Sequence, residues 1–395
     1  MQNLIIKSEN KIVLVTDDFH RYLFEKINFN NRLIAILGAR GTGKTTMLLQ
    51  VAKKFRDKET LYVALDDLFF TNNNLYTLAD EFNKTGGELL LLDEVHKYPE
   101  WSREIKLIYD DFPDLQVIFT SSSVLDIYKG ESDLSRRAVN YHLKELSFRE
   151  YLLFFEQLGL PTYTIEEVIS NHTEIASGLL KRIKPLKHLK KYYQTGVYPY
   201  YSGNEEEYYQ ALRNTINLIL EIDIQSVRGI EYANIAKFKR LLYVLAGNVP
   251  FIPNISKLAE KVNVNRNLLI EALRLLERAE LIQTCIKASK SISYLNKPDK
   301  IWLHNTNLNF AIAGDKINTG TLRETFFLQH VSVMHSVTLP DKGDFLLNNK
   351  YTFEVGGKNK KQHQIAGLED AFIVRDDIEL GTKKIIPLWL FGLIY

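Results

Sequence analysis

The sequence predicts an α/β protein of two or three domains that begins with a parallel β-sheet covered by helices on both faces. Two observations support this fold class. The chain has 395 residues, which is more than one hydrophobic core comfortably serves. Apolar runs of strand length recur near residues 32–37, 60–65, 89–93 and 116–120, as expected for buried strands of a parallel sheet.

Composition indicates where the protein is located and says little about its activity. The chain is 45% hydrophobic and 25% charged, and its net charge is +2, so any nucleic-acid-binding face must be local. Cys285 is the single cysteine, which excludes an intrachain disulfide and fits a reducing compartment. The N-terminus lacks the features of a signal peptide, and no apolar run approaches the ~20 residues that span a bilayer. We therefore expect a cytoplasmic protein with no membrane partner.

The first strand leads directly into a phosphate-binding motif. Residues 38–45 read GARGTGKT and match G-x-x-x-x-G-K-[ST] at every fixed position. The glycines allow the backbone to direct N–H groups at phosphates, and the following helix adds its positive dipole end. Lys44 would reach the β- and γ-phosphates of ATP, and Thr45 would ligate Mg²⁺. The predicted nucleotide-binding residues are Gly38, Ala39, Arg40, Gly41, Thr42, Gly43, Lys44, Thr45 and Thr46. The alternative is a glycine-rich turn that merely caps a helix.

A second motif follows about 50 residues later. Four leucines, Leu89 to Leu92, precede Asp93 and Glu94, so a buried strand ends in two carboxylates. Asp93 would hold Mg²⁺ through water, and Glu94 would orient and polarise the attacking water. The extra strand near residues 60–65, together with Glu94 beside Asp93, indicates the class that hydrolyses ATP with its own glutamate.

The strand near residues 116–120 ends in hydroxyl groups. Val117 to Phe119 precede Thr120, Ser121, Ser122 and Ser123, an arrangement that fits a contact to the γ-phosphate. Ser121 or Ser122 is the expected contact, and the alternative is a serine-rich turn without a role in binding.

Together with residues 135–152, SRRAVNYHLKELSFREYL, these motifs resemble prokaryotic AAA-type ATPases that carry a conserved C-terminal domain of unassigned function. The resemblance implies a P-loop NTPase sheet with a helical lid, then a winged-helix domain, then a small α/β restriction-endonuclease-like domain. The corresponding segments are 1–150, 151–205, 206–304 and 305–395. The resemblance also implies that Arg136 or Arg137 meets the γ-phosphate, either within the chain or from a neighbour in an oligomer. A plain surface arginine pair is the alternative.

The middle of the chain predicts a winged helix from its own pattern. Apolar positions fit a helix over 255–262 and a second helix from 266, and a strand and a polar hairpin follow. Asn265, Arg266 and Asn267 would lead the recognition helix and face DNA. Acidic residues on the same helix favour instead a packing or protein-interaction module. The basic run over 181–191 is either a phosphate-backbone contact or a solvated face of the lid.

The C-terminal part predicts a helix with Glu324, a hairpin and a last buried strand over 383–395. A nuclease of this fold needs an acid on one strand and Glu-x-Lys on the next, where i and i+2 share a face. Glu354 and Lys358 are four residues apart instead. With Asn348 and Asn349 as a two-residue turn, Asp344 faces away from Glu354, whereas a three-residue loop would place both on one face.

These observations predict an ATP-binding and ATP-hydrolysing AAA-type protein that uses Mg²⁺ and whose nucleotide state switches its lid and C-terminal domains. DNA would bind through the winged helix, and a homo-oligomer or a protein partner is also expected. Two alternatives stay open. One is an ATP-gated metal-dependent nuclease, and the other is a switch or scaffold that binds ATP without turning it over.

Overall fold

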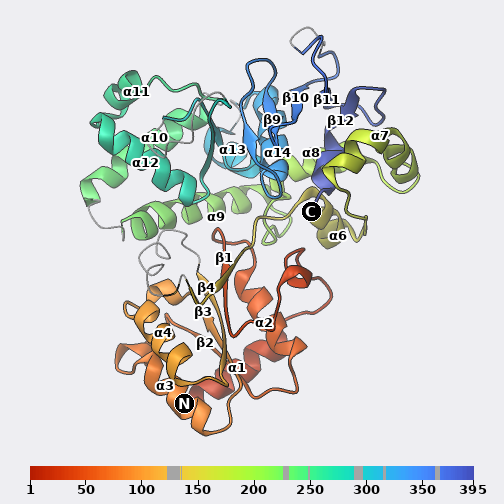
Figure 1. Ribbon diagram of the computed structural model, residues 1–395. Helices are drawn as coiled ribbons and strands as arrows, with labels where there is room; N and C mark the ends of the chain where they lie inside the picture. Colours follow the sequence, from red (N-terminus) through yellow and green to blue (C-terminus); the bar gives the residue numbers. More distant parts are fainter. Residues whose placement is uncertain are drawn as a thin grey trace. The chain divides into compact units, whose positions relative to one another are not determined.

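The computed structural model describes residues 1–121, 134, 136–225, 231–247, 250–288, 297–314, 317–360 and 365–395 (Figure 1). The chain forms two compact units, Met1–Glu145 and Leu146–Tyr395. The predicted first boundary at 150 therefore lies close to the observed one.

The first unit is built on a five-stranded parallel sheet in the order β2-β3-β4-β1-β5. Four strands lie where the apolar runs predict them, and a fifth lies at the edge beside β1. The strands are β1 (Leu33–Leu37), β2 (Thr60–Ala64), β3 (Leu89–Asp93), β4 (Gln116–Ser121) and β5 (Val139–His142). The sequence does not predict β5, because this strand is largely exposed and its residues form no apolar run.

Helices cover both faces of this sheet, as predicted. Alternate residues of β1 enter different cores: Ile34 and Ile36 pack with α2, whereas Leu33 and Ala35 pack with α3 and α4. The helices of this unit are α1 (Gln2–Leu14), α2 (Lys44–Lys54), α3 (Leu75–Lys84) and α4 (Trp101–Asp111), with short 3₁₀ turns at η1 (Phe24–Lys26), η2 (Leu68–Thr71) and η3 (Val95–Lys97).

The second unit begins with helices that the sequence analysis assigned to a separate lid. These helices pack instead on the C-terminal elements of the same unit: α6 and α7 contact η7, and α7 also contacts β12. A capping box of Ser147 and Glu150 starts α6. The helix ends at Glu156, and the next residue, Gln157, adopts the left-handed conformation. The helices are α6 (Phe148–Glu156), α7 (Ile165–Leu179), α8 (Pro185–Thr195) and α9 (Glu205–Leu218), which continues as the π-helix η4 (Ile219–Ile224).

The predicted helix–turn–helix and hairpin are present in the middle of this unit. Asn263 in the left-handed conformation ends α11, and Asn265 caps α12. The two strands that follow, β6 and β7, are antiparallel, and residues 289–296 between them lie outside the described part of the chain. The elements are α10 (Tyr232–Ala246), α11 (Ile255–Val262), α12 (Arg266–Arg278), β6 (Ile282–Cys285), β7 (Lys300–Leu303) and α13 (Thr306–Ala313). This order agrees with a winged helix, which stays a prediction.

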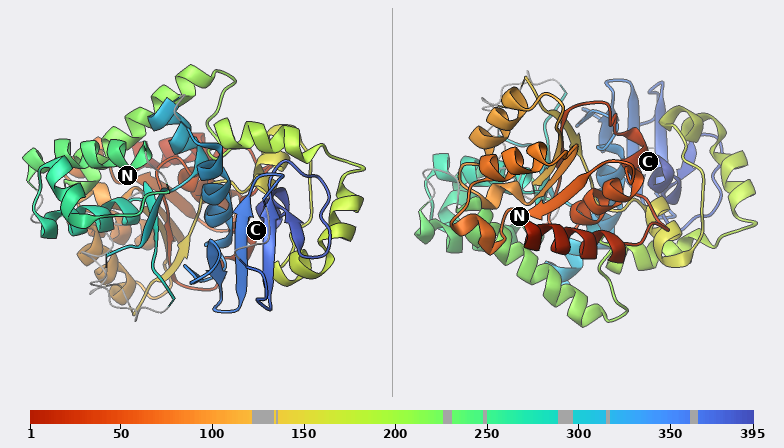
Figure 2. Two further views of the ribbon diagram at one scale, coloured as in Figure 1. Left: turned by 90° about the horizontal axis from the view of Figure 1, so that it is seen from above. Right: turned by 90° about the horizontal axis from the view of Figure 1, so that it is seen from below.

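A second sheet, in the order β12-β11-β10-β9-β8, completes the unit, and Figure 2 shows its strands side by side in blue. The structure differs from the prediction in two respects here. Residues 371–375, between the predicted hairpin and the last predicted strand, form a further buried strand, β11. The last predicted strand stops at Pro387 and continues as a buried 3₁₀ helix. The elements are α14 (Thr319–Val331), β8 (Val337–Thr338), β9 (Phe345–Leu347), β10 (Tyr351–Gly356), β11 (Ala371–Arg375), β12 (Ile385–Pro387) and η7 (Leu388–Leu393).

Candidate nucleotide-binding site

The phosphate-binding loop occupies the turn between β1 and α2. Gly38 approaches the neighbouring backbone so closely that a Cβ atom there would lie 2.2 Å from the carbonyl oxygen of Leu143. Gly43 has a φ of 96°, a conformation that favours glycine. Both glycines are therefore required by the path of the loop.

Lys44 is folded onto this loop. Its Nζ donates hydrogen bonds to the carbonyl oxygens of Gly38 at 2.9 Å and Ala39 at 2.7 Å. Thr42 also donates to Ala39. Arg21 also contacts the loop, since its guanidinium donates to the carbonyl oxygens of Thr42 and Lys144. The ammonium group of Lys44 is thus held against the backbone of the loop.

Asp93 accepts hydrogen bonds from hydroxyl groups of three different elements. Its Oδ2 accepts from Thr45 of α2 at 2.8 Å and from Tyr62 of β2 at 2.8 Å. Its Oδ1 accepts from Thr120 of β4. The carboxylate itself is 3% exposed, so these donors offset the cost of burying its charge. The two residues predicted to hold Mg²⁺, Thr45 and Asp93, are thereby in direct contact.

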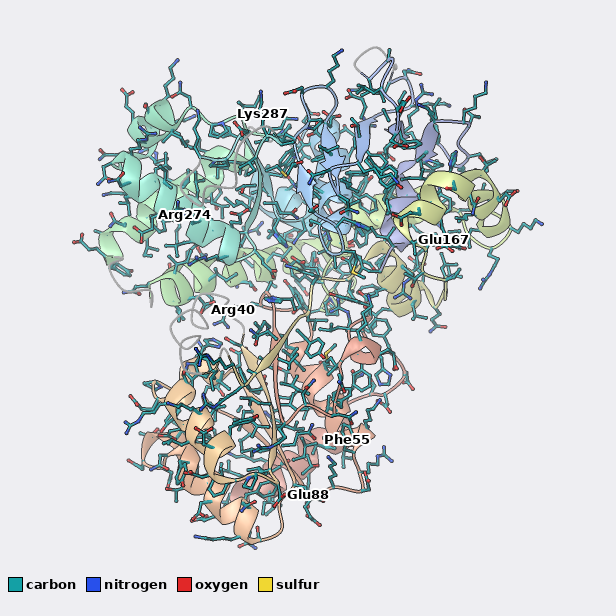
Figure 3. All side chains as sticks on the ribbon, in the orientation of Figure 1. Arg40, Phe55, Glu88, Glu167, Arg274 and Lys287 are labelled. Carbon is teal, nitrogen blue, oxygen red and sulfur yellow. The ribbon has the colours of Figure 1, made fainter. Side chains whose placement is uncertain are left out.

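Glu94 lies next to the loop in a left-handed backbone conformation, with φ 53°. Such conformations in a non-glycine residue cost energy and cluster at functional sites. Its backbone N–H donates to Thr120 Oγ1 at 3.0 Å. Its Oε2 lies 3.7 Å from a guanidinium nitrogen of Arg40 and 3.5 Å from Nε2 of His96. Figure 3 labels Arg40 in the loop that follows β1.

His96 is uncharged in this environment. Burial is the main cause that lowers its pKa to about 3, and the positive charges of Arg40, Lys97 and Lys44 contribute to the same shift. The other ring nitrogen, Nδ1, lies 3.2 Å from the hydroxyl of Ser121. His96 therefore links Ser121 to Glu94 through a neutral ring.

Comparison with known families finds a similarity in this part of the chain. Residues 30–152 match a family described as "AAA domain". The first unit is therefore similar to an AAA domain. Residues 186–316 match a second family, described as "Domain of unknown function (DUF8612)".

Two full-length relatives come from Methanocaldococcus jannaschii. "Uncharacterized protein MJ1637" is 25% identical over 403 residues, covering 91% of this chain and 84% of that protein. "Uncharacterized protein MJ1544" is 23% identical over 420 residues, covering 92% and 89%. Among solved structures, AMPPCP-bound DnaA from Aquifex aeolicus is 20% identical and covers 65% of this chain and 84% of that chain at a TM-score of 0.26. That value is too low to carry an argument.

No helix within the described residues is long and apolar enough to cross a membrane.

Other predicted residues of the AAA domain lie apart from Asp93. Ser121 contacts His96, and Ser122 lies outside the described residues. Arg137 forms a two-point ion pair with Asp110 at 2.9 and 3.0 Å, and Arg136 is exposed. Thr46 is exposed at the start of α2.

Sequence reasoning missed four residues of the site: Arg21, Tyr62, His96 and Thr120. Thr120 carried a signal, because it is the first hydroxyl after the apolar strand. Arg21, Tyr62 and His96 carried none, because their contacts come from tertiary packing.

The C-terminal hairpin corrects a prediction about the acidic residues. Tyr351 pairs with Leu347, so Asn348, Asn349 and Lys350 form a three-residue loop, and the predicted two-residue turn is wrong. Both asparagines adopt the left-handed conformation. The strand pairing ends at Phe345 and Phe353. Beyond it, the N–H of Asp344 donates to the carbonyl oxygen of Phe353 at 2.9 Å, and the N–H of Val355 donates to Asp344 Oδ2 at 2.9 Å.

Lysines lie against each of these acids. Lys360, rather than Lys358, pairs with the fully buried Glu354 at 2.6 Å. Lys300 lies 3.6 Å from Glu324 and 3.8 Å from Asp344. Burial and the charge of Asp344 raise the pKa of Glu324 and of Glu354, and the lysines act in the opposite direction. Among the residues that the structure describes, no group of three or more His, Cys, Asp or Glu could hold a metal ion.

The predicted DNA-facing residues are accessible in the second unit. Arg266 and Asn267 are exposed at the start of α12, and Asn265 caps that helix through the N–H of Leu268. The lysines of the basic run over 181–191 are exposed as well. Exposure is compatible with either prediction for these segments.

Proposed function

We propose that this protein binds ATP with Mg²⁺ at the AAA domain and hydrolyses it, with Glu94 as the residue that activates water. The observation that carries the proposal is the hydrogen bond between Thr45 and Asp93. These residues are 48 positions apart in the sequence and meet beside an intact phosphate-binding loop. A hydroxyl and a carboxylate are the hard oxygen ligands that suit Mg²⁺.

Each side chain has a defined task in this proposal. Lys44 exchanges its carbonyl partners for the β- and γ-phosphates, and the N–H groups of the loop bind the same oxygens. Mg²⁺, when bound, supplies positive charge to the phosphate oxygens. Thr45 would hold it directly and Asp93 through water. Glu94 orients the attacking water and accepts its proton.

The proposal includes transmission of the nucleotide state to the second unit. Gly38 of the loop lies against Leu143, and only three residues separate Leu143 from Ser147, which caps α6. A displacement of the loop on nucleotide binding would therefore reach the start of the second unit along the backbone.

Two substitutions test the assignment. Lys44→Ala removes a charged donor, so ATP affinity should fall roughly 10- to 100-fold. Glu94→Gln keeps the size of the side chain and removes the base, so hydrolysis should fall by about 10² to 10⁴ while ATP binding persists. Glu100→Gln changes an exposed glutamate at the start of α4. It should leave ATP affinity and the rate of hydrolysis unchanged. Wild-type hydrolysis by Glu94→Gln would remove Glu94 from its role.

A single-turnover measurement separates the enzyme from a switch that only binds ATP. Protein in excess over radiolabelled ATP and Mg²⁺ should convert the bound nucleotide to ADP. Retention of intact ATP at full occupancy would favour the non-hydrolysing scaffold. The cytoplasmic location, the DNA contact and the oligomeric state stay predictions.

Metal-dependent cleavage of nucleic acid is the second candidate function, and the position of Asp344 favours it. Its Oδ2 accepts a hydrogen bond from the N–H of Val355, the residue after Glu354, so an acid just before β9 lies close to an acid on β10, as the catalytic arrangement requires. Lys300 and Lys360 now lie against the acids, so a divalent cation would have to displace them.

The cleavage hypothesis has a direct test. Supercoiled plasmid incubated with the protein, ATP and Mg²⁺ or Mn²⁺ should be cut, and Glu354→Ala should abolish cutting. Glu369→Ala, which changes an exposed glutamate outside the cluster, should cut normally. If the wild-type protein leaves the plasmid intact with both metals, the C-terminal part has a non-catalytic role.

A further inference from the structure

Tyr62 connects the edge of the first sheet to the predicted magnesium ligand. It lies in the middle of β2, opposite Leu91 of β3, so that Asp93 is its diagonal neighbour on the same face. The phenol donates to Asp93 Oδ2 at 2.8 Å, and the whole side chain is 3% exposed.

The direction of this hydrogen bond is fixed. Burial raises the pKa of the Tyr62 phenol well above its usual range, and the adjacent charge of Asp93 raises it further. The phenol therefore stays protonated at any working pH, and the carboxylate is the acceptor.

Three donors leave Asp93 little freedom. A carboxylate offers about four acceptor positions, and Thr45, Tyr62 and Thr120 occupy three of them. Thr45 belongs to the phosphate-binding motif, and Thr120 also receives the N–H of Glu94. Tyr62 belongs to neither motif. Among the described residues of the two motifs, its hydroxyl contacts Asp93 alone.

The N-terminal helix holds Tyr62 in place. β2 is an edge strand, and the outward N–H of Tyr62 donates to the buried Ser8 hydroxyl of α1 at 2.9 Å. Lys11 of α1 lies 3.5 Å from the phenol oxygen and 4.9 Å from the ring centre. Leu4 packs in one core of the unit and Ile12 in the other, so α1 crosses the edge of the sheet.

We propose that Tyr62 is a positioning residue for the magnesium site, which fixes the Asp93 carboxylate from the side of β2 and α1 and thereby sets the affinity for Mg²⁺ in the nucleotide complex. The proposal rests on the function proposed above. It adds a residue and a helix that the nucleotide-binding motifs do not contain.

Binding of a fluorescent ADP analogue measures this role without requiring hydrolysis. The analogue is titrated onto the full chain in EDTA and at graded free Mg²⁺ concentrations. Tyr62→Phe removes one hydroxyl and keeps the ring. The Mg²⁺ concentration for half-maximal tightening should rise roughly 10- to 100-fold, the effect of losing one hydrogen bond to a charged group, and affinity in EDTA should stay unchanged. Tyr76→Phe removes a similar 2.8 Å bond to Asp111 outside the site and should match the wild type.

A double-mutant cycle keeps the proposal falsifiable if Tyr62→Phe also lowers stability. In an Asp93→Asn background the Mg²⁺ effect should already be lost, and Tyr62→Phe should add nothing. Equal Mg²⁺ dependence in Tyr62→Phe and wild type would overturn the inference, as would an equal loss of affinity in EDTA. Failure of the wild-type protein to bind the analogue would instead overturn the proposed function.

Discussion

At the scale of single residues, the surroundings of Glu94 determine what this carboxylate can do. Arg40 lies 3.7 Å away on one side and His96 lies 3.5 Å away on the other. The lowered pKa of His96 makes its contact a neutral one, so Arg40 supplies the positive charge. Since Arg40 belongs to the phosphate-binding loop, phosphate would compete with Glu94 for it. We therefore expect that nucleotide binding would release Glu94, the proposed base, from Arg40.

His96 also makes the stability of the AAA domain depend on pH. Its folded pKa is about 3, whereas an unfolded histidine titrates near 6.5. Between these values only the unfolded chain takes up the proton, so stability contributed by the neutral ring is lost as pH falls below about 6.5. The loss between pH 7 and pH 5 amounts to about 2 kcal/mol.

Calorimetric unfolding of the full chain at pH 7 and pH 5 tests this pH dependence. The transition of the first unit should move down more in wild type than in His96→Gln, which cannot titrate. His20→Gln, which changes a more exposed histidine of the same unit, should behave as wild type. Equal acid sensitivity in His96→Gln and wild type would contradict the folded pKa.

At the scale of elements, the sequence predicts those strands whose burial is complete. β1 and β3 are buried along their whole length, so an unbroken apolar run defines them. β5 is an edge strand with exposed residues, and its pairing with β1 comes from the tertiary fold. The sequence also predicts the phosphate-binding loop, because the residues of its motif are consecutive. The hydrogen bond between Tyr62 and Asp93 joins two strands, so neither segment alone predicts it.

The C-terminal hairpin shows how one residue of loop length changes a functional prediction. The sequence suggested Asn348 and Asn349 as a two-residue turn, but the strand pairing resumes only at Tyr351. A shift of one residue exchanges the two faces of a strand. Asp344, just before β9, accepts a hydrogen bond from the N–H of Val355 beside Glu354. Similarly, Lys360 reaches Glu354 from beyond the end of β10, where strand periodicity no longer applies.

At the scale of the whole molecule, the chain consists of two units, each with a five-stranded sheet. The second unit combines the segments predicted as lid, winged helix and nuclease-like domain. Buried polar contacts connect them: Gln329 of α14 donates to the hydroxyl of Tyr192 of α8 at 2.9 Å. Asn307 of α13 donates to the carbonyl oxygens of Tyr192 and Tyr193. Removing residues 151–205 would leave such groups unpaired, at a cost of about 1–3 kcal/mol each.

This division predicts that nucleotide binding belongs to the first unit alone. The residues that shape the candidate site, from Arg21 to Lys144, all lie within 1–145. A fragment of residues 1–145 should therefore fold and bind ATP with an affinity within about tenfold of the full chain, a difference of about 1.4 kcal/mol. The same fragment with Lys44→Ala should bind far more weakly, and residues 151–205 alone should stay unfolded by circular dichroism. A folded 1–145 fragment without ATP affinity would mean that the second unit supplies part of the site.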